Sequence, residues 1–318
     1  MSLPLPQGFS DLVNRVKTED PFSTRAAPTR TADIWDSFTY FVFLDHNRTD
    51  AEASYLYDLL KHEGLLEMAK VQHLAGKWSG QVGLVASSKL KGLQPGRKTS
   101  VLRDLMTTIA DSEQCILEGH RYFRKHGVTG SWITSRTRTK PDVDKLLWEW
   151  GWNDYQKNPD HIWRFGLTKG ILLLNSIGLA LNYCPPSRQV HRFMEEDMGR
   201  RPISQPSSGP SSQTSSIWSW STDFAAIRGV QTVASTISPQ TQRATTADVG
   251  HSIWYWKSAQ GLLAFTRGGL RKKLTPKRFL DFLLARSYNL PDFSEALHDI
   301  DVVDQLATDL RSYVAAMP

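Results

Sequence analysis

Aromatic and charged side chains that could hold a ligand gather in LLWEWGWNDYQKNPDHIWRF, residues 146–165. An exposed tryptophan can stack on a nucleobase, which contributes about 1–3 kcal/mol per base, and Arg164 next to Trp163 could add a cation. Large aromatic side chains more often bury their area in a core or at a domain junction. Both interpretations stay open, and the candidate ligand-binding residues of this stretch are Trp150, Trp152 and Arg164.

Acid–base or metal chemistry would use the nine histidines and their acidic neighbours. His191 and Glu195 have the spacing of two metal ligands on one side of a helix, although an ion pair within the helix is the commoner use. Asp45 and His46 either cap a following helix or contribute to a dispersed enzyme site. The serine nucleophile elbow, the two-histidine zinc helix and the glycine-rich phosphate loops do not occur. We therefore expect no metal and no cofactor, and the sequence identifies no catalytic residue.

Three basic segments are the second feature that could bind a partner, in a chain with a net charge of +6. Residues 68–103 and 119–141 contain no Asp or Glu, and the third segment is RGGLRKKLTPKR, residues 267–278. Such segments bind phosphate backbones with release of counterions, unless they are ordinary surface cations that separate in space. The cations that we expect to contact nucleic acid are Lys89, Lys91, Arg97, Lys98, Arg121, Arg124, Lys125, Arg136, Arg138, Arg271, Lys272, Lys273, Lys277 and Arg278.

Helices must position these residues, because apolar side chains recur at helical spacing along the chain. Pro141 and Gly151 are typical of the start and end of one helix, and Thr275 with Pro276 predicts the start of another. We expect helices over residues 32–43, 49–64, 100–127, 141–151, 170–183, 275–286 and 299–317. The predicted fold class is mainly α.

The composition predicts a division of the chain into four parts. Residues 1–30 form a partly flexible N-terminal arm, and residues 31–202 form the main helical domain. Residues 203–222 are rich in Ser and Pro and carry no charge, which indicates a linker or long loop. Residues 223–318 form a smaller helical C-terminal region.

The chain has features that favour an intracellular location, in the cytoplasm or the nucleus. Its two cysteines cannot form a disulfide framework, and its N-terminus lacks the apolar run of a secretory signal. The longest apolar run, residues 170–183, is shorter than the roughly 20 residues that span a bilayer. A core helix is the first interpretation of that run, and peripheral membrane association stays open.

The leading hypothesis is a protein without catalytic activity that binds RNA or single-stranded nucleic acid through its basic segments and its Trp-rich stretch. A packaging or coat role in a homo-oligomer fits this hypothesis. A second hypothesis is a peripheral membrane protein that binds anionic lipid through residues 170–183 or 267–286. A third is an enzyme acting on nucleobases or nucleotides, with a dispersed site that includes Asp45 and His46.

Overall fold

The computed structural model describes a chain built from helices. The described residues are 5–44, 50–73, 77, 80–81, 84, 112–151, 158–199, 212–237, 241, 244–263 and 269–317, without the side chains of residues 72–73 and 212–221. All regular elements among these residues are helical and none is a strand, which confirms the mainly α fold. The chain forms two compact units: unit 1 is Met1–Ala26 with Leu174–Pro318, and unit 2 is Ala27–Leu173.

Unit 2 packs its helices around a cluster of aromatic rings. Its helices are α2 (Thr31–Phe43), α3 (Asp50–His62), α4 (Met68–His73), an unlabelled helix over residues 112–126, α7 (Gly130–Ser135) and α8 (Lys140–Gly151). The Phe38 ring lies 5.4 Å from the Phe123 ring and 4.6 Å from the Phe165 ring. The Trp150 ring lies 5.9 Å from Phe165, so residues of the Trp-rich stretch form part of this core.

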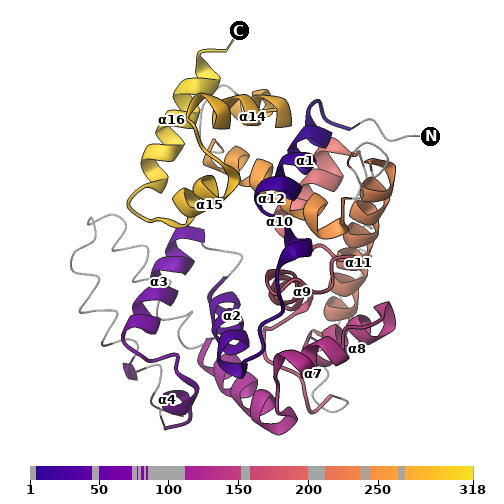
Figure 1. The fold of residues 1–318 in the computed structure, drawn as a ribbon, viewed down its shortest axis with the longest axis vertical. Coiled ribbons are helices and arrows are strands. Elements are labelled where there is room, and N and C mark those ends of the chain that lie inside the picture. The colour runs from indigo at the N-terminus through magenta and orange to yellow at the C-terminus, as the bar shows by residue number, and fades with distance from the viewer. Residues whose placement is uncertain are drawn as a thin grey trace. The chain divides into compact units, whose positions relative to one another are not determined.

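Unit 1 combines the N-terminal helix with the C-terminal half of the chain. Its helices are α1 (Phe9–Glu19), η1 (Phe22–Thr24), α10 (Arg188–Arg192), η3 (Phe193–Asp197), α11 (Ser212–Ile237), α12 (Thr246–Leu262), α13 (Leu270–Lys273), α14 (Pro276–Ala285), α15 (Leu290–His298) and α16 (Val303–Ala315). Helix α1 packs against α12, α14 and α15 (Figure 1). Phe9 of α1 stacks on Phe193 of η3 at 5.2 Å, so this contact joins the N-terminal helix to η3.

Side-chain caps determine where several helices of unit 1 begin. Thr275 accepts a hydrogen bond from the backbone N–H of Arg278 at 3.3 Å, and Pro276 is the first residue of α14, as the sequence predicted. Helix α12 begins with a capping box between Thr245 and Asp248. Each cap satisfies backbone N–H groups that have no partner within the helix, which stabilises the helix start by about 1 kcal/mol.

The structure divides the chain at other points than the sequence indicated. The predicted flexible arm contains α1, whose buried residues Phe9, Leu12, Val13 and Val16 follow a helical apolar pattern that the prediction missed. Residues 212–222 of the predicted linker belong to α11, while residues 203–211 lie outside the described residues.

The longest apolar run forms a helix that is shorter than predicted. Helix α9 covers Leu167–Ser176, and the chain then turns at Gly178, whose φ of 75° is in the left-handed region. The Asn175 amide donates to the carbonyl oxygens of Leu179 and Ala180, both at 3.2 Å, and so holds this turn in place. Among the described residues, we find no helix whose length and apolar character would allow it to cross a bilayer.

Candidate nucleic-acid interface

The helix over residues 112–126 presents three of the predicted cations on the surface of unit 2. Arg121, Arg124 and Lys125 are exposed, and their i, i+3, i+4 spacing places them on neighbouring positions of the helix surface. The other side of the helix is fixed in the core by close packing at Gly119. A Cβ atom there would lie 2.2 Å from Cζ of Phe38, so only glycine permits this approach.

A loop over residues 158–166 lies along the same helix. The backbone N–H of Trp163 donates to Oε2 of Glu118 at 2.6 Å, and Nζ of Lys125 donates to Oδ1 of Asp160 at 2.5 Å. Glu118 also lies 3.7 Å from the guanidinium of Arg121. Because one carboxylate holds both Arg121 and the residue before Arg164, the loop brings a fourth predicted cation beside the helix. Arg164 is exposed there, with a φ of 56°.

We call Arg121, Arg124, Lys125 and Arg164 the basic face. Its cations come from two segments that are separated by about 40 residues of sequence, and the contacts of Glu118 and Asp160 bring these segments together. The sequence placed Arg164 in the Trp-rich stretch and the other cations in a basic segment, without evidence that the two would meet.

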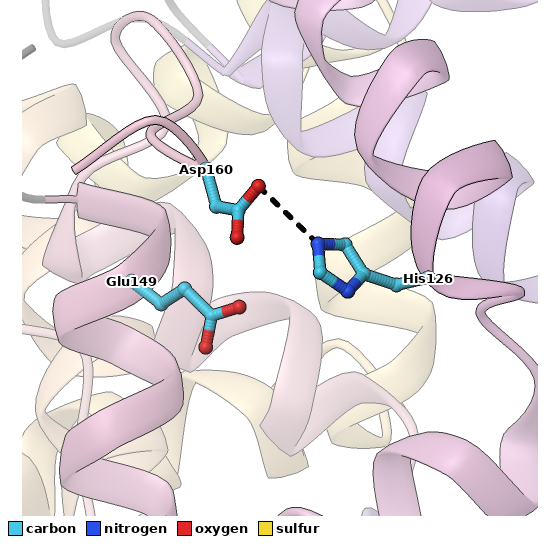
Figure 2. Close-up of side chains that lie close together, drawn as sticks. All are labelled: His126, Glu149 and Asp160. Atoms are coloured by element: carbon cyan, nitrogen blue, oxygen red, sulfur yellow. Dashed lines mark ion pairs between the residues drawn. The ribbon is translucent and has the colours of Figure 1, made fainter.

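A histidine and two carboxylates lie next to the basic face. Figure 2 shows His126, Glu149 and Asp160 with their side chains pointing toward one another. One ligand atom from each side chain lies within 4.8 Å of the other two, and Nε2 of His126 is 3.3 Å from Oδ1 of Asp160. The three residues come from the helix over residues 112–126, from α8 and from the loop over residues 158–166.

Neighbouring groups set the charge of this cluster. Burial raises the pKa of the Asp160 carboxyl, but the hydrogen bond from Lys125 and the interactions with His126 outweigh it, so the pKa lies below its ordinary value. Glu149 forms an ion pair with Arg136 and accepts a hydrogen bond from the Tyr122 hydroxyl at 3.0 Å. Burial first, and then the charge of Glu149, raise the pKa of Tyr122, which keeps this hydroxyl protonated as a donor.

The two other predicted cations of the second basic segment, Arg136 and Arg138, differ in their surroundings. Arg136 is paired with Glu149, and its guanidinium lies 5.2 Å from the centre of the Trp132 ring. Arg138 is exposed. Arg136 therefore takes part in the packing of unit 2, whereas Arg138 extends the exposed positive charge of the segment.

Trp150 does not offer a ring for stacking, so its place among the predicted binding residues is wrong. Only 1% of its surface is exposed, because it lies on the buried side of α8 with Val143, Leu146 and Leu147. Trp148 lies between these positions and is 46% exposed. The helical period of the buried residues would have identified Trp148 as the outward ring.

Some of the remaining predicted residues lie in unit 1, and the others lie outside the described residues. In unit 1, Arg271 makes two hydrogen bonds of 2.5 and 2.6 Å to Glu196, and Arg278 donates to the carbonyl oxygen of Lys273 at 2.9 Å. Lys272 and Lys277 are exposed. The residues that lie outside the described ranges are Asp45, His46, Lys89, Lys91, Arg97, Lys98 and Trp152.

Unit 1 contains a buried charge network that the sequence did not reveal. The Lys257 side chain has 0% exposure and forms ion pairs with Asp197 and, at 3.6 Å, with Glu196. Burial lowers the pKa of Lys257 and raises that of Asp197, and in each case the partner opposes the shift. Both acids belong to η3, a π-helix, and such segments often occur at functional sites.

His191 has a different partner from the one that its spacing suggested. Its Nε2 atom lies 2.9 Å from Oδ1 of Asp223 in α11, and Glu195 is exposed. The pairing within one helix is therefore wrong, because α10 ends at Arg192 and the following π-helix changes the register of Glu195. Among the described residues, this histidine has no second acid close enough to complete a three-ligand cluster.

The chain matches no known protein family, no curated protein and no solved structure. The function is therefore inferred from the side chains alone.

Proposed function

We propose that the protein binds single-stranded nucleic acid, with RNA as the first ligand to test, through the basic face of unit 2. The observation that carries the proposal is the role of Glu118, which contacts Arg121 and the backbone next to Arg164. This arrangement supports a continuous set of cations from two segments. A guanidinium carries five donors, so Arg121 retains donors for a phosphate group while it contacts Glu118 at 3.7 Å.

Binding by this face would depend on phosphate charge more than on base identity. Each phosphate neutralised on a single strand contributes about −0.7 to the slope of log affinity against log salt. Trp148 supplies an exposed ring in the same unit, on which a base could stack without a fixed sequence. We therefore expect salt-dependent binding with little sequence preference.

Binding to anionic lipid finds less support among the described residues. The apolar residues Ile171, Leu173 and Leu174 of α9 are buried, so they form no exposed apolar face that could enter a membrane. On α14, Leu284 is 76% exposed, while Phe279, Phe282 and Leu283 are buried. One exposed leucine gives little apolar area to insert between headgroups.

The test is fluorescence anisotropy of a labelled oligouridylate, measured from about 50 to about 200 mM salt. The variant R121A/R124A removes two cations of the basic face. The variant R188A/R228A is the matched control, because it removes two exposed arginines of unit 1. We expect R121A/R124A to reduce the salt slope by about 1.4, which is two phosphate contacts, and the control to keep the slope of the wild-type protein.

Equal losses of affinity in the two variants would show that net charge attracts the RNA and that the basic face is not the interface. Absence of RNA binding by the wild-type protein at the lowest salt would reject the proposal. Vesicles of anionic lipid, titrated in parallel, separate the two hypotheses: binding to vesicles without binding to RNA supports the membrane interpretation.

A further inference from the structure

We propose that His126, Glu149 and Asp160 form a binding site for one divalent transition-metal ion, with Zn²⁺ as the probe. The three side chains come from separate elements of unit 2 and point toward one common position (Figure 2). An imidazole nitrogen with two carboxylates is a donor set that suits Zn²⁺ and related ions. Metal binding at this site is a property separate from nucleic-acid binding, and its test uses no nucleic acid.

The distances require only a small adjustment to bind an ion. Bonds from Zn²⁺ to nitrogen or oxygen are about 2.0–2.2 Å, so two ligand atoms on one ion are at most about 4.4 Å apart. The three ligand atoms already lie within 4.8 Å of one another. Rotation of partly exposed side chains can supply a change of this size, without movement of the backbone.

The His126 ring supplies an independent reason to expect a ligand. Its Nε2 atom is shielded from solvent, and its ion pair with Oδ1 of Asp160, at 3.3 Å, does not have the geometry of a good hydrogen bond. A shielded polar nitrogen whose hydrogen-bonding geometry is poor is costly to bury, and coordination would satisfy it. The ring is oriented by Tyr122 at 4.4 Å and Trp132 at 6.0 Å between ring centres.

Tyr122 also acts on a second ligand of the proposed site. Its hydroxyl donates to Oε1 of Glu149 at 3.0 Å, and the other carboxylate oxygen accepts from Arg136, the cation that an ion would replace. Groups of this kind orient the ligands of a metal site, and their loss typically weakens metal binding by about 10–100-fold. We assign Tyr122 as a positioning residue for Glu149.

Two cations neutralise the carboxylates when no ion is bound. Lys125 pairs with Asp160, and Arg136 pairs with Glu149. The Lys125 side chain is 57% exposed and can turn into solvent, while Arg136 can keep its contact with the Trp132 ring. A metal ion therefore competes with these cations, and removal of Lys125 should strengthen metal binding.

Isothermal titration of the full-length protein with Zn²⁺ tests the site. We expect one equivalent to bind to the wild-type protein, with affinity reduced at least about tenfold in H126A and in E149Q. The variant H191A is the matched control, because His191 also pairs with one acid but lacks a third ligand among the described residues. It should bind Zn²⁺ like the wild-type protein, and K125M should bind more tightly.

Nitrogen-15 signals of the histidine rings identify the ligand directly. Addition of Zn²⁺ should shift the signal that is missing in H126A, and it should leave the His191 signal in place. Absence of binding, equal affinity in H126A and wild type, or weaker binding in K125M would each overturn the proposal. If H126A fails to fold, K125M and the ring signals of the wild-type protein still decide. RNA binding can fail while this site stands, because Zn²⁺ is the only ligand in the titration.

Discussion

Replacement of Lys257 by methionine should destabilise the protein by about 3 kcal/mol at neutral pH. The ammonium group has 0% side-chain exposure, and its partners are Asp197, Glu196 at 3.6 Å and the amide oxygen of Gln260 at 3.1 Å. Removal of one member of a buried ion pair costs about 3–5 kcal/mol, because the other charge stays buried without compensation. Asp197 already has a raised pKa and can take up a proton, so we expect the lower end of this range.

A double variant, K257M/D197N, shows whether the stability lost in K257M comes from its ion pair with Asp197. Methionine has an apolar stem like that of Lys257, whose Nζ atom lies 4.3 Å from the centre of the Trp256 ring. The packing against this ring is therefore largely preserved. In K257M/D197N neither charge remains. The loss in this double variant should be smaller than the sum of the two single losses, by about 1–3 kcal/mol.

Urea unfolding followed by far-UV circular dichroism measures these free energies, and hydrogen exchange of the α12 amides checks that the change is local to that helix. The control is K272M, which removes an exposed lysine of unit 1 and should change stability by less than about 0.5 kcal/mol. The reasoning would be refuted by a loss in K257M no larger than that in K272M, or by single losses that simply add.

Two further predictions concern other buried groups. Burial lowers the pKa of His251 to about 3, opposed by Asp20 and reinforced by Arg25, whereas the unfolded value is 6.5, so the unfolded chain binds more protons between these values. The free energy of unfolding should therefore fall as the pH drops from about 6.5 towards 3, by up to about 1.4 kcal/mol per pH unit. Acid titrations of stability should show a shallower slope for H251N and an unchanged slope for the exposed control H62N. In the helix over residues 112–126, G119A should lower the free energy of unfolding in urea by about 1–3 kcal/mol, because its Cβ would meet the Phe38 ring. The control G261A in α12, where a Cβ meets nothing within 4 Å, should be neutral or stabilising. A stabilising effect of G119A would contradict the packing of this helix.

The helices were predictable where a local signal decides the structure. The Thr275–Pro276 pair and the apolar stripe after it gave the start of α14 correctly. The sequence did not predict the end of α9, because it depends on the amide of Asn175 bonding to two carbonyl groups after the turn. Such a contact competes with the helical pattern and has no signal in apolar spacing.

The candidate site was less predictable, because its charges have partners from distant parts of the sequence. Arg136 meets Glu149, 13 residues away, and Arg271 meets Glu196, 75 residues away. Composition counts such an arginine as a free surface charge, although its charge is compensated within the fold. The absence of acids from a segment, such as residues 119–141, therefore does not show that its cations are unpaired.

The number of cations in the basic face limits how many phosphates the proposed RNA interface can neutralise. The basic face has four cations, so it can neutralise at most about four phosphates, and the salt slope on a single strand should not exceed about −2.8 in magnitude. The Asp160 contact of Lys125 and the Glu118 contact of Arg121 would each reduce the magnitude of the slope by up to about 0.7, which is one phosphate. A steeper slope would require further cations, and Arg138 is the other predicted cation that is exposed among the described residues of unit 2. The salt dependence of the wild-type protein thus tests whether the basic face is the whole interface, before any residue is changed.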